Sequence, residues 1–428
     1  MTVEKAKLQN GMSIYVDHID GALVNEINVH VPYGSVHEAP GEEGVAHVFE
    51  HSVFLQTKKF KTDTAMVRYT KLHGVDINAH TNYTSTVYDG SGIDIEPSLV
   101  YLSEVLQYPQ FPVKKFDHEM KAIRREIAEG WDNTDAMHEM ALWYSMFGLP
   151  YGRDIGGHHG KLDFTADQMH DIFERCYKIG RMSLVVAGAA TLDEVVGVAE
   201  RYFDTDSDNT SKLKEPRKPR IARGGRRTGT IDDNSYSANV SVGFPMTAEF
   251  RRKYNADRLV YRLAEQAMTE NLFNDLRTKR GISYGASLSA DDSNHPNAWG
   301  YVASTSVDDK HVEKAIRIMR ETFLMGSESY KDIDLRGQIA VEKYSLARQV
   351  PMIGARSLRV LDALNGYYAI REIADDYEQI KETEPEDIRE AIDEIVDLAS
   401  LSPEFIHVTG TVEAVGPADK LIDLHEIA

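Results

Sequence analysis

The sequence predicts an α+β protein built from two homologous domains, each a mainly antiparallel sheet covered by helices on one face. Three observations support this fold class. The chain has 428 residues, more than one hydrophobic core usually serves. Strand-like and helix-like segments recur in a similar order in the two halves. A polar segment rich in proline and glycine separates these halves.

The first half begins with a turn signal and continues with alternating strands and helices. Asn10 and Gly11 favour a tight turn between two short strands. The run NEINVHVPYGS alternates apolar and polar residues, which is typical of a half-buried strand, and INAHTNYTSTVYDGSGI predicts two more strands. A buried strand and a helix, in SLVVAGAATLDEVVGVAERYF, follow near the end of this half. Helical spacing is found at residues 44–56, 62–73, 96–107 and 115–144.

The change of composition after this half indicates a linker. Apolar residues nearly vanish in TDSDNTSKLKEPRKPRIARGGRRTG, so we expect a linker at 205–230 between domains at 1–204 and 231–428. Beyond it, SANVSVGFPMTA repeats the pattern of NEINVHVPYGS, and EFIHVTGTVEAV repeats that of SLVVAGAATLDEV. The sequence therefore predicts a duplicated domain.

Composition and charge exclude several classes of protein. Hydrophobic residues make up 42% and charged residues 27%, as in ordinary globular proteins. No apolar run is long enough to cross a bilayer, and the N-terminal MTVEKAKLQNGMSIYV lacks the apolar core of a signal peptide. The net charge of −20 argues against binding to nucleic acid. It suits either long-range attraction of cationic substrates or a solubilising acidic surface.

The single cysteine, Cys176, cannot form an internal disulfide. This suits a reducing compartment, so we expect a cytoplasmic protein. Because Cys176 lies at the end of a predicted amphipathic helix, we expect a buried structural thiol rather than a catalytic one.

The stretch GVAHVFEHSVF contains the strongest chemical signal in the chain: His47, Glu50 and His51. Residues four apart on a helix lie one above the other, so the two imidazoles would face a single point. Glu50 would lie about 60° around the helix from His47, within reach of a metal-bound water. H-x-x-E-H is the inverted zincin motif. The alternative is a helix whose histidines form hydrogen bonds within the fold or face water.

The motif and its surroundings resemble the pitrilysin and insulin-degrading enzyme family of zinc peptidases, particularly half-size members similar to mitochondrial processing peptidase. The lead-in GSVHEAPGEEGVAHVFEH and the loop LPYGRDIGG carry this resemblance together with the layout of both halves. It implies one Zn²⁺ per chain, held by His47, His51 and a glutamate about 75 residues further on. Glu126 lies 75 residues after His51.

The resemblance also implies that Glu119 supports the metal site from its outer shell. Glu119 and Glu126 are seven residues apart, nearly two helical turns, so both carboxylates would project from one face. Without the resemblance, each of them would be interpreted as a solvated charge on a helix.

Two further segments resemble the substrate-binding parts of the family. INAHTNYTSTVY resembles its substrate-binding edge strand, with Asn78 and Ala79 at the most characteristic positions. An edge strand offers unpaired N–H and C=O groups to a peptide, although this segment would be a strand in any case. DLRTKRGISYGAS supplies Arg277 and Tyr284, which match an arginine and tyrosine that the family aims at the substrate and which could stabilise an oxyanion. A purely structural role is the alternative for this pair.

The sequence thus predicts a zinc-dependent endopeptidase or oligopeptidase with Glu50 as general base. It would hydrolyse peptides or unfolded segments inside the chamber of a homodimer, in which Arg277 and Tyr284 complete the site of the partner chain. Neither nucleic acid nor membrane is an expected partner. Two alternatives stay open: a peptidase dedicated to one precursor or leader peptide, and a non-catalytic peptide-binding or scaffold subunit.

Overall fold

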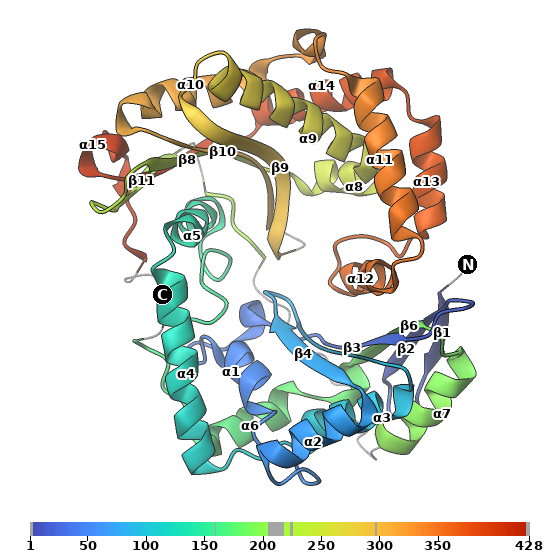
Figure 1. Cartoon of the computed structure of the whole chain (residues 1–428). Coiled ribbons are helices and arrows are strands. Elements are labelled where there is room, and N and C mark those ends of the chain that lie inside the picture. Colours follow the sequence, from blue (N-terminus) through green and yellow to red (C-terminus); the bar gives the residue numbers. More distant parts are fainter. Residues whose placement is uncertain (1–2, 159, 204–217, 223–225, 296–297, 425–428) are drawn as a thin grey trace. The chain divides into compact units, whose positions relative to one another are not determined.

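The computed structural model describes residues 3–158, 160–203, 218–222, 226–295 and 298–424 (Figure 1). Contacts divide the chain into two compact units. The first combines Met1–Glu129, Asp154–Arg217 and Gln349–Ile373, and the second combines Gly130–Arg153, Lys218–Arg348 and Ala374–Ala428. Most of the predicted linker lies outside the described residues, and its last part, 226–230, belongs to a strand.

The first unit contains a six-stranded sheet. Its strands are β1 (Glu4–Lys7), β2 (Ser13–His18), β3 (Asn25–Val31), β4 (Asp76–Thr81), β5 (Thr86–Gly92) and β6 (Ser183–Gly188). They lie in the order β1-β2-β6-β3-β5-β4, and every neighbouring pair except β2 and β6 is antiparallel. Strand β4 lies at one edge of the sheet and comes after the predicted metal-binding helix in the sequence.

Helices cover this sheet unequally on its two faces. The unit holds α1 (Val45–Ser52), α2 (Asp63–His73), α3 (Ile95–Gln107), most of α4 (Val113–Trp131), α6 (Ala166–Cys176), α7 (Leu192–Phe203) and α12 (Ile353–Leu364). Among these helices, α12 lies on the face opposite α2, α3 and α7 (Figure 1). There Val360 and Leu361 pack against Val87 and Val185 of the sheet. Helices α2, α3 and α7 therefore share one face of the sheet, and α12 covers part of the other, here called the open face.

The second unit repeats this plan. Its sheet consists of β7 (Arg226–Ile231), β8 (Ala238–Pro245), β9 (Ser283–His295), β10 (Ala298–Val307), β11 (Phe405–Gly410) and β12 (Lys420–Leu421). The order β12-β7-β11-β8-β10-β9 places β7, β11, β8, β10 and β9 where β2, β6, β3, β5 and β4 stand in the first sheet. The predicted α+β class with two homologous domains is confirmed.

The helices of the second unit also cover the two faces of their sheet unequally. They are α5 (Thr134–Phe147), α8 (Ala248–Ala256), α9 (Arg258–Phe273), α10 (Val312–Leu324), α11 (Leu335–Gln349), α13 (Ile373–Glu382), α14 (Pro385–Leu401) and α15 (Val412–Val415). Helix α5 lies on the opposite side of the sheet from α9 and α10 (Figure 1). His138 of α5 contacts Ser241 of β8 at 2.8 Å and Thr409 of β11 at 2.9 Å. Each sheet thus receives on its open face one helix from the other half of the sequence.

One predicted helix is interrupted. The helical pattern over 115–144 predicts a single helix, but the structure separates α4 from α5 at residues 132 and 133. The side chain of Asn133 accepts hydrogen bonds from the backbone N–H groups of Asp135 and Ala136, at 3.0 and 3.2 Å. An asparagine in this position is a strong N-cap, so a new helix begins here.

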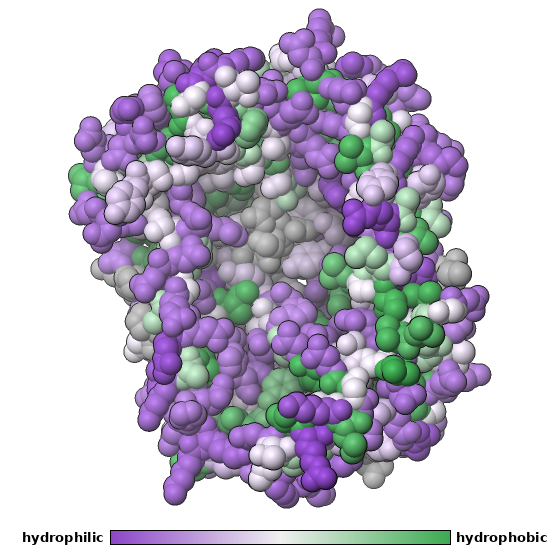
Figure 2. All heavy atoms as spheres, viewed as in Figure 1, coloured by the Kyte–Doolittle hydropathy of each residue, from purple (hydrophilic) through white to green (hydrophobic). Residues whose placement is uncertain are grey.

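Most side chains on the face shown in Figure 2 are hydrophilic, and the apolar ones form separate patches. Within the described residues, no helix combines the length and apolarity that spanning a membrane requires. Cys176 is buried, as predicted.

Candidate metal centre and active site

Helix α1 carries the H-x-x-E-H motif and has a distinctive start. Its N-cap is Gly44, whose φ of 87° lies in the left-handed region that favours glycine. The carboxylate of Glu38 accepts hydrogen bonds from the backbone N–H groups of Gly44 and Ala46, both at 3.0 Å. These bonds satisfy donors that the first turn leaves unpaired, and the negative charge suits a helix N-terminus. Glu38 therefore fixes the first turn, one residue before His47.

The apolar face of α1 anchors the helix in the core. Val45, Val48 and Phe49 are fully buried, and the ring of Phe49 packs against Phe173 and Tyr177. The motif residues lie on the remaining face. The rings of His47 and His51 are adjacent there, with centroids 4.8 Å apart.

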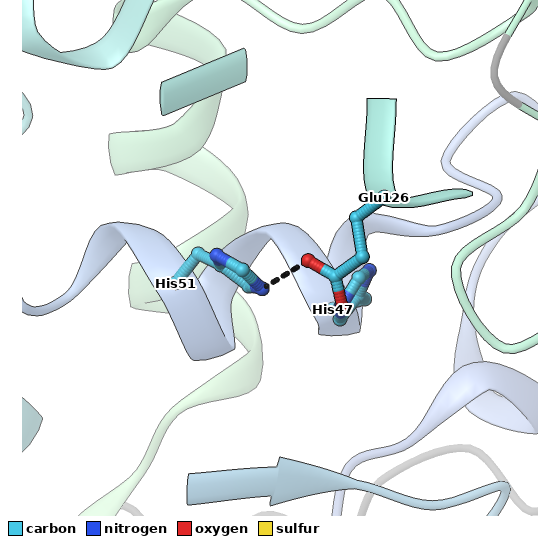
Figure 3. A group of neighbouring side chains, drawn as sticks. All are labelled: His47, His51 and Glu126. Atoms are coloured by element: carbon cyan, nitrogen blue, oxygen red, sulfur yellow. Dashed lines mark ion pairs between the residues drawn. The ribbon is translucent and has the colours of Figure 1, made fainter. Parts of the chain in front are cut away.

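Glu126 of α4 meets both histidines (Figure 3). Its carboxylate oxygens lie 3.7 Å from Nε2 of His47 and 3.4 Å from Nε2 of His51. One ligand atom from each of the three residues lies within 4.8 Å of the others, so this group could hold a metal ion. Two imidazoles and one carboxylate form a donor set found in catalytic zinc sites, which keep a fourth position for water. The residues therefore fit a zinc ion.

Glu119 supports this group from behind. Its Oε1 accepts a hydrogen bond from Nδ1 of His51 at 3.0 Å. In the neutral ring, a proton on Nδ1 leaves the lone pair of Nε2 free for a metal. The helical spacing of seven residues does place Glu119 and Glu126 on one face of α4, as the sequence predicts.

The electrostatic surroundings of the two histidines differ. Burial lowers the pKa of His47 to about 4, and His51 adds to this effect, so His47 is held neutral. Burial also opposes the charged form of His51, but its hydrogen bond to Glu119 and the charges of Glu126 and Glu50 outweigh burial and raise its pKa. A metal would replace the proton that these carboxylates attract.

Glu50 is fixed by a residue that the sequence interpretation missed. The hydroxyl of Thr81, on β4, donates a hydrogen bond to Oε2 of Glu50 at 2.7 Å. Burial raises the pKa of Glu50, while the bond from Thr81 and the neighbouring His51 counteract this rise. One carboxylate oxygen is thus oriented by the strand. Only its position next to the characteristic Asn78 and Ala79 could have drawn attention to Thr81.

Comparison with known proteins identifies the family. The model of the insulinase family, peptidase family M16, matches residues 18–157, which contain the motif and Glu126. A second model, described as the peptidase M16 inactive domain, matches residues 163–329. The chain belongs to the insulinase family of peptidases. The first match lies within the first half of the sequence, and the second begins near the end of that half and continues into the second half.

Relatives within this family include named zinc proteases. A protein named uncharacterized zinc protease from Rickettsia bellii is 27% identical over 285 residues, covering 65% of this chain and 68% of that one. A probable mitochondrial-processing peptidase subunit beta from Schizosaccharomyces pombe is 27% identical over 249 residues. That alignment covers 56% of this chain and 53% of the yeast protein, so the chain spans about half the length of this relative.

Solved structures show the same fold. The structure titled peptidase M16 inactive domain from Pseudomonas fluorescens aligns with a TM-score of 0.77 at 16% identity. The alignment covers 97% of this chain and all of the other. At this identity the likeness concerns the fold alone.

The predicted substrate strand of this insulinase-family protein lies at a sheet edge. Among the described strands, β4 pairs only with β5. Exposed and half-buried residues alternate along it, with Asn78 exposed and Ala79 half-buried. The outer backbone groups of β4 are therefore available to an added strand.

Arg277 and Tyr284 belong to the second unit and contact each other there. Arg277 lies in a π-helical turn, Asn274–Thr278, a type of distortion that is frequent at functional sites. Its guanidinium donates to the backbone carbonyl of Tyr284 at 2.8 Å and lies 5.5 Å from the centre of the tyrosine ring. The side chain of Tyr284 is 91% exposed. An aromatic residue so exposed is available to bind a ligand.

The loop LPYGRDIGG contributes a close approach behind the first histidine. A Cβ atom added to Gly156 would lie 3.1 Å from Nδ1 of His47 and 2.9 Å from Ile127. From the side of α1, a Cβ atom added to Gly44 would lie 2.3 Å from the carbonyl oxygen of Gly156. Glycine is therefore required at position 44, and a larger residue at position 156 would press on the side chains of His47 and Ile127.

Proposed function

We propose that the chain is a zinc-dependent endopeptidase or oligopeptidase that hydrolyses peptides and unfolded segments. The observation that carries this proposal is the convergence of His47, His51 and Glu126, from two helices, beside an oriented Glu50. Membership of the insulinase family supports it. One Zn²⁺ per chain would be held by Nε2 of each histidine and the Glu126 carboxylate.

The chemistry divides between the ion and the protein. When bound, zinc lowers the pKa of a coordinated water to about 7 and polarises the carbonyl of the peptide. Glu50 accepts the proton of the attacking water and delivers it to the leaving amine. Thr81 holds one oxygen of Glu50, so the other can face the water. Glu119 keeps the ring of His51 oriented through Nδ1.

The peptide is held on β4 as an additional strand. Backbone groups near Asn78 and Ala79 provide hydrogen bonds that depend little on the substrate's side chains. This position places the peptide next to Thr81, whose hydroxyl contacts Glu50. Binding at the strand and proton transfer are thereby linked through one residue.

Arg277 and Tyr284 stabilise the carbonyl oxygen as it becomes anionic, and we propose that they act on the site of a partner chain in a homodimer. Both sets of residues are present in each chain, so a homodimer would contain two composite sites. Mixing Glu50→Gln chains with Tyr284→Phe chains should restore activity when dimers exchange, because some heterodimers hold one intact site. Absence of recovery in exchanging dimers would reject shared sites.

A peptidase dedicated to one precursor is a second candidate. The similarity to a probable mitochondrial-processing peptidase subunit beta favours it. A library of unrelated peptides separates the two functions, because a dedicated processing enzyme should leave most members uncut. A non-catalytic subunit is the third candidate, and the intact motif with Glu126 argues against it.

Metal analysis combined with a quenched-peptide assay tests the proposed function. The purified protein should contain about one zinc per chain and cleave the peptide, and Glu50→Gln should keep zinc but lose cleavage. A protein without stoichiometric zinc and without activity would instead support the non-catalytic subunit. The cytoplasmic location stays a prediction.

A further inference from the structure

The turn between β4 and β5 lies next to the residue that orients Glu50. Thr81, whose hydroxyl contacts Glu50, is the last residue of β4, and it pairs with Thr86 at the start of β5. The backbone N–H of Asn82 donates to the carbonyl oxygen of Ser85 at 2.7 Å and closes the turn. Because Thr81 borders this turn directly, a shift of the turn would move the Thr81 hydroxyl relative to the carboxylate.

The turn contacts the segment that leads into α1. The backbone N–H groups of Ser35 and Val36 donate to the carbonyl oxygens of Asn82 and Tyr83, at 3.4 and 3.0 Å. This segment continues through Glu38, which fixes the first turn of α1. The turn therefore links β4 to the lead-in of the helix that carries the H-x-x-E-H motif.

The same turn is bonded to Asn365, the residue that follows α12. Oδ1 of Asn365 accepts hydrogen bonds from the hydroxyls of Ser85, at 2.7 Å, and Thr84, at 3.4 Å. It also lies 3.0 Å from Nε2 of His30, on β3, and this nitrogen must donate because an amide oxygen only accepts. Three donors from two segments therefore converge on one oxygen atom, in a residue 280 positions after Ser85.

The donors that meet this oxygen are buried. Ser85 is fully buried and His30 is 4% exposed, so water has little access to either group. Burial lowers the pKa of His30 to about 4, and the bond to Asn365 only partly counteracts this, so the ring is neutral at pH 7. A buried donor that loses its partner costs more stability than an average hydrogen bond contributes. The amide oxygen is therefore the acceptor on which the position of the turn depends.

Asn365 is itself held by the first sheet. Its backbone N–H donates to the carbonyl oxygen of Leu361 at 2.9 Å, and Leu361 packs in one cluster with Val87 of β5. Earlier in α12, the guanidinium of Arg356 forms a two-pronged ion pair with Asp17 of β2, with Nε 2.7 Å from Oδ2. Both side chains are buried, and paired bonds of this kind fix geometry as well as charge. Helix α12 therefore places Asn365 at a defined position relative to the turn.

We propose that Asn365 is a positioning residue for the peptidase reaction, because it holds the β4–β5 turn where Thr81 can orient Glu50. The proposal rests on the proposed function, in which Glu50 is the general base. Asn365 acts through the turn, since the hydrogen bonds of its side chain end at the turn and at β3. A residue from the second half of the sequence thus takes part in orienting the general base.

Substitution of Asn365 separates positioning from packing. Asn365→Leu keeps the approximate size of the side chain but removes the acceptor, so kcat should fall about tenfold while KM changes little. KM is spared because Asn78 and Ala79, where the peptide is proposed to bind, pair with β5 away from the turn. Asn365→Asp provides an acceptor at the same place and should restore most of kcat.

A double-mutant cycle identifies the path of the effect. If Asn365 acts through Thr81, adding Thr81→Val to Asn365→Leu should lower kcat little further, because the bond to Glu50 can be lost only once. Independent effects would multiply to a fall of about 100-fold. A fall of that size, or a kcat of Asn365→Asp as low as that of Asn365→Leu, overturns the proposal.

The control is Asn234→Leu, the same substitution at an exposed position of the second unit. It should leave kcat and KM unchanged. Thermal unfolding of each variant verifies that it folds. If Asn365→Leu does not fold, Ser85→Ala replaces it, because it removes the shortest of the three bonds from the side of the turn. This variant should show the same loss of kcat and the same cycle with Thr81→Val.

Hydrogen exchange separates failure of the positioning role from failure of the proposed function. Mass spectrometry should show faster exchange over residues 81–86 in Asn365→Leu than in the wild type, with unchanged exchange in α14 of the second unit. Faster exchange in this segment, combined with a wild type that cleaves no peptide, supports the hold on the turn and rejects only the proposed function. Unchanged exchange over residues 81–86 overturns the proposal, whatever the activity.

Discussion

Helices α1 and α9 occupy equivalent places in the two repeats, but the acidic residues of the two helices differ in burial and in hydrogen bonding. Each helix follows the central strand, β3 or β8, and precedes the edge strand, β4 or β9. In α1, Glu50 is half-buried and bonded to Thr81, next to two histidines. In α9, which has no histidine, Glu265 is buried and one of its oxygens has no hydrogen-bond partner.

The comparison teaches that the repeat fixes positions in space but not their chemistry. In α1 the acid lies beside two histidines and a donor orients it, which suits a general base. A fully buried acid without a cationic partner stays protonated, and the protein loses stability when that acid becomes charged. The predictions below change one helix or the other and are ordered by expected effect.

The largest effect is expected for Glu50→Gln in α1. The amide of this variant could still accept the bond from Thr81 but could not take a proton, so kcat/KM should fall about 10³-fold or more. Zinc content, measured by atomic absorption, should stay that of the wild type because Glu50 is not among the three converging residues. Full activity in a zinc-loaded Glu50→Gln protein would refute the assigned role.

The matching change in α9, Glu265→Gln, should affect stability and its pH dependence. Burial raises the pKa of Glu265 to about 8, above its ordinary value of 4.5. The contribution of this group to the stability of the wild type is fully present below pH 4.5, the ordinary pKa, and is lost as the pH rises through the folded-state pKa of about 8. The side chain of the variant does not titrate, so the variant should become the more stable protein with rising pH, by on the order of 3 kcal/mol at about pH 8.

Thermal unfolding of both proteins at about pH 5 and about pH 8, near the two ends of the pH range over which the difference develops, measures it. Glu390→Gln, at an exposed position of α14, is the control. Its stability relative to that of the wild type should not change with pH. If the Glu265→Gln advantage were the same at both values of pH, the buried acid would not be the cause.

A smaller effect is expected for Glu119, which contacts the metal-binding residue His51. Glu119→Gln should lower the affinity for zinc about 10- to 100-fold, since the amide no longer attracts the Nδ1 proton of His51 as strongly. Competition with a zinc chelator measures the affinity directly. Unchanged affinity would show that Glu119 does not support the site.

The smallest effect is expected for Thr81, the missed neighbour of Glu50. Thr81→Val keeps the shape but removes the hydroxyl, so kcat should fall about tenfold while KM changes little. Thr81→Ser should restore kcat because it restores the donor. Equal loss in both variants would mean that Thr81 acts through packing rather than through its hydrogen bond.

The residues of the metal cluster could be predicted from the sequence more fully than the residues around them. The helical spacing of His47 and His51 placed both rings on one face, and the resemblance singled out Glu126 and Glu119, which the structure brings to them. The roles of Arg277 and Tyr284 stay predictions. Glu38 and Thr81 were missed because each acts through hydrogen bonds to another segment, two for Glu38 and one for Thr81, which leave no periodic pattern in the sequence.

The exchanged helices were likewise beyond the sequence pattern. The spacing over 115–144 predicts helix correctly, but it does not reveal that Asn133 starts a second helix that packs on the other sheet. Helix α12 in the second half has an equivalent position on the first sheet. An amphipathic pattern shows that a helix has an apolar face, not which surface covers it.

The sequence by itself predicted the main strands and helices of the first half, the duplication and the pair of histidines on one turn of helix. These features depend on contacts between residues a few positions apart, which the periods of about 3.6 and 2 record directly. The order of the strands decided the rest, because it placed Thr81 beside Glu50. Such neighbours are set by long-range packing, which leaves no local period in the chain.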